Sequence, residues 1–487
     1  MDLHLLICAA YFICLGALGA WGVHRILLLH WLNNPAPPID PYRQVQPSVL
    51  VQLPVYNEAA VIGRLIDAVA QLDWPSLRIQ VLDDSTDQTS SLATNRIAYW
   101  ARQGIQIRHI QRKNRVGYKA GALTEGLSQD DSEFIAIFDA DFVPPKDFLQ
   151  QMMVSFASPN TGMVQARWGH LNRDQSWLSR IQSMMLDGHF LIEHTARYRT
   201  GRFFNFNGTA GIWRRSAILD AGGWSHDTVT EDLDLSYRAQ MAGWSFVYRD
   251  DVVAPAEVPA SMQAFLTQQH RWAKGTVQTA RKLLGPILRA PLPWSVRLEA
   301  SNHLTMVLAY PFVFSLALLL PWSISARDAL LSQGMAWLDL FAILATTVSI
   351  ACFYAAALRC GGEHLRQRWW EIPLAMAVGI GCSGGQTLAV IEGMFSDDAT
   401  FVRTPKQGSS GSIVLVRHNR ISRLLITGAM TAYYLTTILW VVHGGYWTSL
   451  PFVLLFGTGF AINFVDCCLA SGHTEGAGEM GRAPAAK

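Results

Sequence analysis

Apolar and polar residues alternate along this chain in two different ways, and the change comes near residue 285. Before that point, short apolar runs predict strands at 48–53, 78–82, 107–110, 134–138 and 163–166. Longer polar stretches between them predict helices at 58–71, 86–103 and 118–127. Strands that alternate with helices are typical of a mostly parallel sheet with crossover connections. We therefore predict an α/β, Rossmann-like domain at 48–285.

Long apolar segments dominate the rest of the chain. The segments long enough to span a bilayer are 5–23, 304–322, 337–358, 424–442 and 447–468. A further segment, 372–391, is apolar but contains glycines, a serine and a glutamine. The basic stretches 359–370 and 403–423 flank it, and basic loops favour the cytoplasmic face. Because both flanks are then cytoplasmic, we expect 372–391 to be interfacial or re-entrant, leaving five spans and a cytoplasmic C-terminus.

The first apolar segment sets the expected orientation. No lysine or arginine precedes it, whereas Arg25 and Arg43 follow it. This asymmetry favours an uncleaved anchor with the N-terminus outside and the next domain in the cytoplasm. The expected division is an anchor at 1–35, a proline-rich linker at 36–47, the α/β domain at 48–285, interfacial and transmembrane helices at 286–470 and a disordered tail at 471–487.

Composition narrows the range of functions. Only 16% of residues are charged and the formal net charge is +2, so the chain carries no basic footprint for nucleic acid. All seven cysteines lie in the apolar ends, and their spacing matches neither a zinc site nor a disulfide framework. The polar region between them is therefore suited to a reducing compartment.

Carboxylates follow the predicted strands at the points where the apolar runs stop. Asp83 and Asp84 follow 78–82, and Asp139 and Asp141 follow 134–138. Open α/β sheets bind ligands at the carboxyl ends of their strands, so these acids should converge on one crevice. On an extended segment the side chains of residues i and i+2 face the same way, so we expect Asp139 and Asp141 to offer two oxygen ligands to one Mg²⁺ or Mn²⁺. That cation can hold a diphosphate. The structural alternative for both pairs, Asp83 with Asp84 and Asp139 with Asp141, is a cap on the following helix.

Two further groups complete the predicted chemistry. Asp232 is the expected base that takes a proton from an acceptor hydroxyl, and Glu231 is expected to position it. Lys119 begins a predicted helix, where a cation opposes the dipole unless a phosphate binds there. Arg271 offers a guanidinium for a diphosphate. The alternatives are first-turn acids that cap a helix and a solvated lysine.

Other positions have weaker signals. Tyr56 and Glu58, in the loop after the first strand, are candidates for nucleoside contacts, with a simple turn as the alternative. Trp272 offers an indole on which a sugar face can stack, with Gln268 one turn before it. Asn207 in a small-residue loop and Trp168 beside the expected acceptor path are further candidates. Thr404 and Lys406 belong to a polar loop that either reaches the diphosphate or lies on the membrane surface.

These motifs, in this order, resemble those of the membrane-embedded family 2 glycosyltransferases, the relatives of cellulose synthase. The resemblance is closest to the plant cellulose-synthase-like groups that make β-1,4-mannan and β-1,4-glucan backbones. It rests on VQLPVYNE at 51–58, VLDDSTD at 81–87, GYKAGAL at 117–123, IFDADF at 137–142, VQARW at 164–168, FNGTAGIWR at 206–214, TED at 230–232 and QQHRW at 268–272.

The resemblance implies a GT-A fold on the cytoplasmic face, a metal-held nucleotide diphosphate and inversion at the anomeric carbon. It assigns the metal to Asp139 and Asp141, the base to Asp232, the QxxRW motif to Gln268, Arg271 and Trp272, and a gating loop within 396–412 to Phe401, Thr404 and Lys406. Arg403 and Gln407 depart from the gating-loop pattern of cellulose synthases. Gating of that kind is therefore not expected here.

The expected function is processive, inverting β-glycosyl transfer. The donor would be UDP-glucose or GDP-mannose, and the product a β-1,4-linked polysaccharide moved across the cell (inner) membrane. The alternative is transfer of a single sugar to a lipid, which makes a membrane glycolipid with the same catalytic residues. The sequence leaves the donor, the linkage and any partner subunit open.

Overall fold

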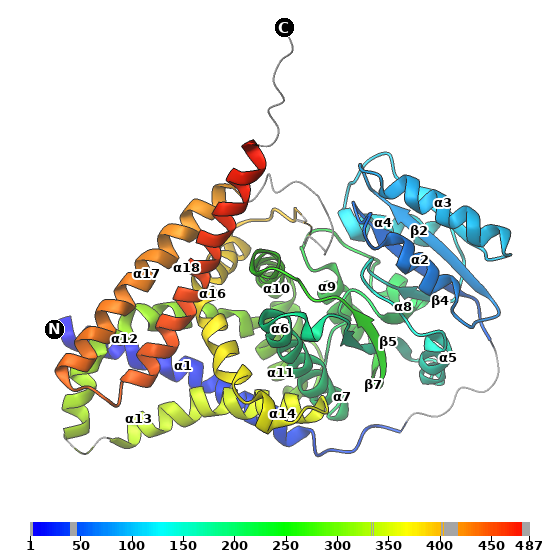
Figure 1. The fold of residues 1–487 in the computed structure, drawn as a ribbon. Coiled ribbons are helices and arrows are strands. Elements are labelled where there is room, and N and C mark those ends of the chain that lie inside the picture. The colour runs from blue at the N-terminus through cyan, green and yellow to red at the C-terminus, as the bar shows by residue number, and fades with distance from the viewer. Residues whose placement is uncertain are drawn as a thin grey trace, which may run out of the picture.

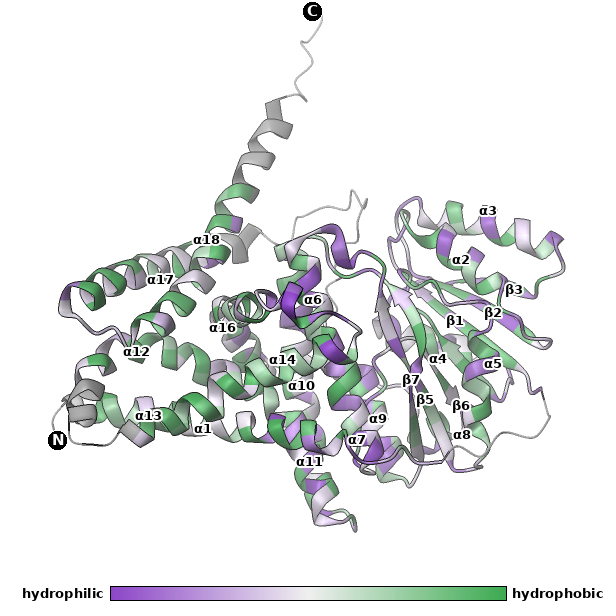
Figure 2. Ribbon diagram, turned by 60° about the horizontal axis from the view of Figure 1, so that its bottom comes forward, coloured by the Kyte–Doolittle hydropathy of each residue, from purple (hydrophilic) through white to green (hydrophobic). Residues whose placement is uncertain are grey.

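The computed structural model describes residues 3–38, 46–332, 334, 336–400, 403 and 417–479. A domain built on one β-sheet lies on one side of the molecule, and the long apolar helices lie on the other (Figure 1). The colouring of Figure 2 separates the same two parts, since green and near-white dominate the long helices and purple is more frequent in the sheet domain.

The sheet has seven strands in the order β3-β2-β1-β4-β6-β5-β7. The strands are β1 (Val49–Val55), β2 (Leu77–Asp83), β3 (Ile107–Gln111), β4 (Phe134–Ile137), β5 (Thr161–His170), β6 (Gly211–Arg214) and β7 (Ser245–Ala256). All paired strands are parallel except β6, which is antiparallel to both β4 and β5. The predicted mostly parallel sheet is confirmed, with one reversed strand inserted.

Strands β6 and β7 have no counterpart among the sequence predictions. Strand β6 is only four residues long and follows a glycine-rich loop. Strand β7 forms the edge of the sheet and carries Arg249, Asp250 and Asp251 at its centre. Charged residues are common on edge strands because an edge that pairs on one side only must avoid further pairing. The apolar-run criterion therefore missed both strands.

Two hydrophobic cores cover the two faces of the sheet. Val49, Val51 and Leu53 of β1 pack on one face with helix α2 (Ile62–Ala70), whereas Leu50 packs on the other with helix α4 (Tyr118–Ser128). Successive residues of a strand point to opposite faces, which produces this division. Helix α2 begins at Ile62, so its predicted start at 58 is wrong and Glu58 belongs to the preceding loop.

The remaining helices of the domain begin with α3 (Thr89–Arg102), which matches the helix predicted at 86–103. The others are α5 (Phe148–Met153), α6 (Trp177–Asp187), the π-helix η3 (Gly188–His194), α7 (Thr195–Arg199), α8 (Arg215–Asp220), α9 (Glu231–Met241) and α10 (Met262–Arg289). In Figure 1, α10 lies between the sheet and the long apolar helices.

Six of the described helical stretches are long and apolar enough to cross a membrane. They involve α1 (Leu3–Trp31), α11 (Trp294–Thr305) with α12 (Ala309–Ser332), α13 (Ala336–Ile343) with α14 (Ser349–Cys360), α16 (Glu371–Phe395), α17 (Arg417–Gly444) and α18 (Leu450–Glu479). Each predicted span overlaps one of these stretches.

Helix α16 corrects the expectation for 372–391. The segment lies within one continuous helix of 25 residues, so the re-entrant interpretation is wrong, and the candidate spans among the described residues number six rather than five. An interfacial position of this helix stays a prediction. Its glycines serve close packing: a Cβ at Gly381 would lie 2.1 Å from the carbonyl oxygen of Gly459 on α18. Small residues that bring apolar helices together are common in membrane bundles. In the sequence, the same glycines resemble a signal for a break in the helix.

Two other expectations concern the C-terminal part of the chain. Helix α18 continues to Glu479, beyond the expected start of a disordered tail at 471, and residues 480–487 lie outside the described residues. Of the expected gating loop, Phe401, Thr404 and Lys406 also lie outside the described residues, whereas Arg403 is described.

Candidate active site

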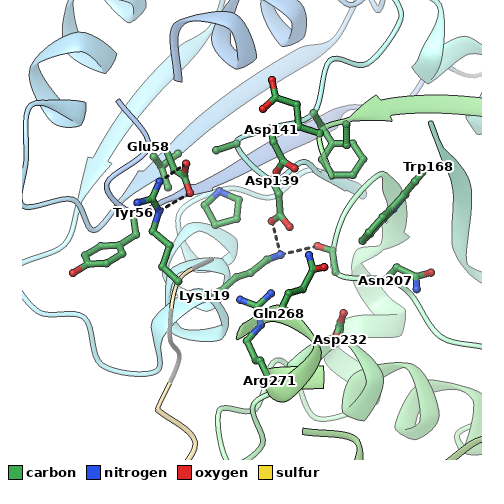
Figure 3. A pocket seen from close by; sticks show the side chains of 18 of the residues that line it. Tyr56, Glu58, Lys119, Asp139, Asp141, Trp168, Asn207, Asp232, Gln268 and Arg271 are labelled. Atoms are coloured by element: carbon green, nitrogen blue, oxygen red, sulfur yellow. Dashed lines mark hydrogen bonds and ion pairs between the residues drawn. The ribbon is translucent and has the colours of Figure 1, made fainter. Parts of the chain in front are cut away.

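One pocket lies at the carboxyl ends of β1, β2 and β4, closed on its other side by the starts of α9 and α10. Most of the predicted site residues line it, namely Tyr56, Glu58, Asp84, Lys119, Asp139, Asp141, Trp168, Asn207, Glu231, Asp232, Gln268, Arg271 and Trp272. Figure 3 shows many of these side chains around one space. The structure therefore brings residues more than 200 positions apart to one place, because parallel strands end at the same edge of the sheet.

Asp139 and Asp141 occupy a turn rather than an extended segment. Strand β4 ends at Ile137, and the backbone N–H of Phe142 donates to the carbonyl of Asp139 at 3.1 Å. The expected strand geometry for this pair is therefore wrong, although both residues line the pocket. The N–H of Asp139 donates to Thr209 Oγ1 at 2.9 Å, which fixes the turn against the small-residue loop.

Lys119 is the cation at the centre of the pocket. Its Nζ donates to Asp139 Oδ1 at 2.5 Å and to the Gly208 carbonyl at 2.9 Å (Figure 3). Burial opposes its charge, but the carboxylates of Asp139, Glu231 and Asp232 outweigh that effect and raise the pKa of Lys119. Gly208 has φ +80°, and a Cβ there would lie 2.9 Å from Asp232 Oδ2. The glycine therefore lets the lysine, the loop and the acids approach one another.

Glu231 and Asp232 form a buried acidic pair in the first turn of α9. Burial, reinforced by the neighbouring Asp232, raises the pKa of Glu231 to about 7. Burial also raises the pKa of Asp232. Asp232 Oδ1 accepts from the N–H of Leu233 at 2.8 Å, so one oxygen takes part in helix capping. Burial of the two neighbouring carboxyls therefore favours the protonated form of the pair at a higher pH than for free carboxyls.

This raised pKa gives a testable dependence of stability on pH. A carboxyl whose folded-state pKa lies above its unfolded value of 4.5 stabilises the fold below that pH and loses its contribution as the pH rises through about 7. We expect the thermal midpoint of the donor-free protein in detergent to fall across this window. Glu231→Gln, which does not titrate, is expected to show a shallower fall. Identical slopes in the two proteins would contradict the assignment.

Helix α10 presents Gln268, Arg271 and Trp272 to the pocket at i, i+3 and i+4, a spacing that puts them on one helix face. Burial lowers the pKa of Arg271, and the carboxylates of Glu231 and Asp139 oppose that effect. A guanidinium remains charged in such a site because its intrinsic pKa is above 12. The arginine thus provides a positive charge opposite the acids.

The start of α9 is locked to the middle of α10 beside this face. Gln278 Oε1 accepts from the N–H of Val229 at 3.0 Å, and the hydroxyls of Thr230 and Thr279 lie 3.2 Å apart. A Cβ at Gly275 would lie 2.5 Å from Thr230 Cγ2, so only glycine permits this approach. The TED and QxxRW segments are therefore held as one unit.

Asn207 is fixed by two histidines that sequence analysis missed. His194 Nε2 lies 2.7 Å from Asn207 Oδ1, and Asn207 Nδ2 lies 2.8 Å from His189 Nε2. Burial lowers the pKa of His194, so the imidazole is neutral and donates this bond. Both histidines belong to η3, where a spacing of five residues matches a π-helical turn. In the sequence, two histidines five residues apart within an apolar stretch are the feature that could have identified this pair.

The two aspartates after β2 have different environments. Asp83 does not line the pocket, and it accepts from Ser90 Oγ at 2.6 Å and His109 Nε2 at 2.9 Å. Burial would raise the pKa of Asp83, but these hydrogen bonds lower it to about 2. Asp84 lines the pocket and pairs with Arg112, whose Nε lies 2.7 Å from Oδ1. Asp83 thus holds the loop, and Asp84 faces the ligand space.

Glu58 is paired with an arginine from a distant part of the chain. Arg403 Nε and Nη2 donate to its two carboxylate oxygens at 2.9 and 2.8 Å. Arg403 belongs to 396–412, the segment that resembles the gating loop of cellulose synthases, and it lines the pocket. The reach of Thr404 and Lys406 to a diphosphate stays a prediction.

The described residues contain no cluster of three or more metal-ligating side chains. Asp139 and Asp141 offer two carboxylates at the pocket wall. Mg²⁺ sites in nucleotide enzymes commonly use one or two carboxylates and complete their coordination with phosphate oxygens and water. The residues present therefore fit a cation that arrives with a nucleotide diphosphate better than a permanent all-protein metal site.

Comparison with known proteins agrees with this geometry. A family model described as "Glycosyltransferase like family 2" matches residues 47–275. Residues 47–275 of this chain are therefore similar to family 2 glycosyltransferases. The match covers the sheet, the acidic turns, the TED segment and the QxxRW motif, which is the part of the chain that builds the pocket.

The curated relatives are plant enzymes. The glycosyltransferase domain is 48% identical over 250 residues to glucomannan 4-beta-mannosyltransferase 2 of Arabidopsis thaliana, covering 50% of this chain and 47% of that protein. It is 44% identical over 256 residues to glucomannan 4-beta-mannosyltransferase 1 of Cyamopsis tetragonoloba, covering 50% and 49%. The match thus spans about half the length of these relatives. The cellulose-synthase-like resemblance is confirmed.

A solved structure shares the fold. The mannosyltransferase PcManGT from Pyrobaculum calidifontis, solved in complex with GDP-Man and Mn²⁺, matches with a TM-score of 0.53 and 23% identity. The match covers 73% of this chain and 98% of that one. The GT-A-like fold inferred from the sequence is therefore confirmed.

Proposed function

We propose that this chain is an inverting, processive β-hexosyltransferase that extends a β-1,4-linked polysaccharide from a nucleotide sugar. The observation that carries the proposal is the convergence of Asp139, Asp141, Asp232 and Arg271 on one pocket. The identity to glucomannan 4-beta-mannosyltransferases supports transfer of mannose in particular. GDP-mannose is the preferred candidate donor, with UDP-glucose as the alternative.

Each residue of the pocket has a defined task in this reaction. Asp232 takes the proton from the acceptor hydroxyl as that oxygen attacks the anomeric carbon. Attack from the face opposite the leaving diphosphate inverts the configuration in one displacement, so an α-linked donor yields a β-linked product. Arg271 and Lys119 stabilise the charge that develops on the departing diphosphate. Trp272 and Trp168 offer aromatic faces against which the acceptor sugars can stack.

A divalent cation held by Asp139 and Asp141 would neutralise the diphosphate and stabilise it as a leaving group. Lys119 Nζ donates to Asp139 Oδ1, so this ammonium lies where it would also contact a diphosphate held at Asp139. PcManGT, which shares the fold, was solved with Mn²⁺.

Removing divalent cations is expected to abolish transfer, and Mg²⁺ or Mn²⁺ is expected to restore it. Asp141→Asn should raise the cation concentration for half-maximal activity by at least about tenfold, since even loss of an outer partner of a metal typically has that effect. The exposed Asp147→Asn on the same loop serves as the control. Full activity in excess EDTA would contradict a metal-held diphosphate.

The pocket is joined directly to the apolar helices, which supports transfer of the product to the membrane. Gln278 Nε2 on α10 donates to the carbonyls of Ser396 and Asp398 at 3.2 and 3.1 Å, just beyond the end of α16. Arg281 Nη1 donates to the Gly393 carbonyl at 3.1 Å. We propose that the glycosyltransferase domain lies on the cytoplasmic face of the cell (inner) membrane and that the apolar helices take up the growing chain.

The decisive experiment separates a polymer from a glycolipid. Purified protein in nanodiscs is incubated with radiolabelled GDP-mannose and UDP-glucose separately, and the products are digested with β-1,4-mannanase and β-1,4-glucanase. We expect a water-insoluble product that only one hydrolase degrades. Products that carry a single sugar with every donor would refute processivity, and their extraction into organic solvent would identify glycolipid synthesis.

A further inference from the structure

Arg115 is a pocket residue that the proposed chemistry does not use. It lies in the loop after β3, and its guanidinium carbon is 3.4 Å from the centre of the Tyr56 ring and 4.9 Å from that of Tyr118. At 3.4 Å the guanidinium lies directly over the Tyr56 ring, with the Tyr118 ring nearby. The N–H groups of a guanidinium lie along its edge and remain the groups that can donate to a ligand.

The other cations around this end of the pocket already have carboxylate partners. Arg112 pairs with Asp84, Arg403 with Glu58, and Lys119 with Asp139. Among the described residues, Arg115 has no ion pair within 4 Å, and its Nε is buried without a hydrogen-bond acceptor. A buried donor without a partner is costly unless a ligand satisfies it.

The loop that carries Arg115 is held rigidly. Arg112 donates to the carbonyls of Val116 and Tyr118, each at 2.9 Å, and the N–H of Tyr118 donates to the Arg115 carbonyl at 3.0 Å. These bonds close the loop around Arg112, so Arg115 is positioned before any ligand arrives. Preorganised side chains of this kind contribute to recognition because little freedom is lost on binding.

The sheet order places Arg115 at the nucleoside end of the proposed donor site. The metal candidates follow β4, and the acids and tryptophan of the acceptor side come from α9 and α10. A nucleotide sugar with its diphosphate at Asp139 and its sugar toward Asp232 must extend its base the other way. That direction leads to the ends of β1, β2 and β3, where Tyr56, Asp84 and Arg115 lie.

We propose that Arg115 selects guanine over uracil in the donor, an inference that rests on the proposed function. Guanine presents two adjacent acceptors, O6 and N7, which match the fork of a guanidinium in a bidentate pair. Uracil has O2 and O4 separated by an N–H donor, so it offers no such adjacent pair. Stacking on Tyr56 holds the fork in one plane, which favours an in-plane contact with the edge of a base. The donor class is then GDP-sugars.

The test measures binding of free nucleotides to the full chain in detergent with Mn²⁺, so it does not depend on turnover. Wild type is expected to bind GDP about tenfold to hundredfold more tightly than UDP, the range of one bidentate base contact. Arg115→Lys keeps the positive charge but loses the paired N–H donors of the guanidinium. Arg115→Gln loses the charge and the paired donors. Both variants are expected to bind GDP as weakly as UDP, with UDP affinity unchanged. The exposed Arg108→Lys on β3 is the matched control and is expected to keep the wild-type ratio.

Several outcomes would overturn the proposal. A wild-type preference for UDP, or an unchanged ratio in both Arg115 variants, rules out guanine selection while leaving glycosyl transfer intact. Equal losses of GDP and UDP affinity would show that Arg115 binds the phosphates instead. Retained UDP binding shows that a variant is folded. Failure of wild type to bind either nucleotide would refute the proposed function itself, and the inference with it.

Discussion

Asp232→Asn is expected to lower the rate of sugar transfer by about two to four orders of magnitude, the usual contribution of a positioned general base. Asparagine has nearly the same shape but does not accept the acceptor proton at neutral pH. Asp232 lies beside Gly208 and the Lys119 ammonium, on the acceptor side of the proposed donor site. Donor affinity should therefore change little. Initial rates of glycosyl transfer and separate nucleotide-sugar binding measurements check the two halves of this prediction.

The control for this change is Asp220→Asn, an exposed carboxylate at the end of α8. It alters the charge by the same amount and is expected to leave the rate unchanged. Turnover of Asp232→Asn within about tenfold of wild type would remove Asp232 as the base, since general-base catalysis typically contributes more than that. Loss of donor binding in the variant would instead indicate a role in holding the donor.

Arg197→Met is expected to destabilise the protein by about 3–5 kcal/mol, the usual effect of breaking a buried ion pair from one side. The Arg197 side chain is fully buried on α7, with Nε 2.9 Å from Glu299 Oε1 and Nη1 3.5 Å from Glu193 Oε2. Glu299, on α11, also pairs with His24 of α1 at 2.8 Å. Removing the arginine leaves two carboxylates in the interior with insufficient positive charge. Unfolding in detergent, followed by tryptophan fluorescence, measures the effect.

The same cluster joins the catalytic domain to the apolar helices. Glu193 accepts from His189 Nδ1 at 3.1 Å, and His189 contacts Asn207 of the pocket. Helix α1 is thereby connected, through ion pairs and hydrogen bonds, to a residue that lines the active site. The change at Arg197 should consequently also reduce activity in protein that remains folded.

Arg180→Met is the matched control for this prediction. Arg180 pairs with Asp174 at 3.2 Å, and both side chains are substantially exposed, so its removal should cost less than about 1 kcal/mol. Neutralising the carboxylates in the triple variant Arg197→Met, Glu193→Gln and Glu299→Gln is expected to recover part of the lost stability. Equal losses of stability in Arg197→Met and Arg180→Met would show that the buried cluster contributes no more to stability than a surface ion pair.

The sequence was sufficient to predict most strands and the residue types of the motifs. It did not show which of two neighbouring motif residues faces the pocket. Asp83 and Asp84 are the same residue type at adjacent positions, whereas only Asp84 lines the pocket. Adjacent residues at a strand end point in opposite directions, and which direction faces the ligand depends on what covers each face of the sheet. The partners His109 and Ser90, which hold Asp83, come from β3 and α3.

The sequence determined two things about this protein. The order of its apolar runs predicted a mostly parallel sheet and long apolar helices. The residue types in its acidic and QxxRW motifs predicted the resemblance to family 2 glycosyltransferases. These are local properties, set by periodicity and side-chain chemistry within short stretches. Only the tertiary structure decided that β6 runs antiparallel, that α16 is a continuous helix against α18, that Arg403 meets Glu58, and that Arg115 stacks on Tyr56. Contacts of that kind join segments up to 345 positions apart. They depend on how complete elements pack, and no short stretch of sequence contains that information.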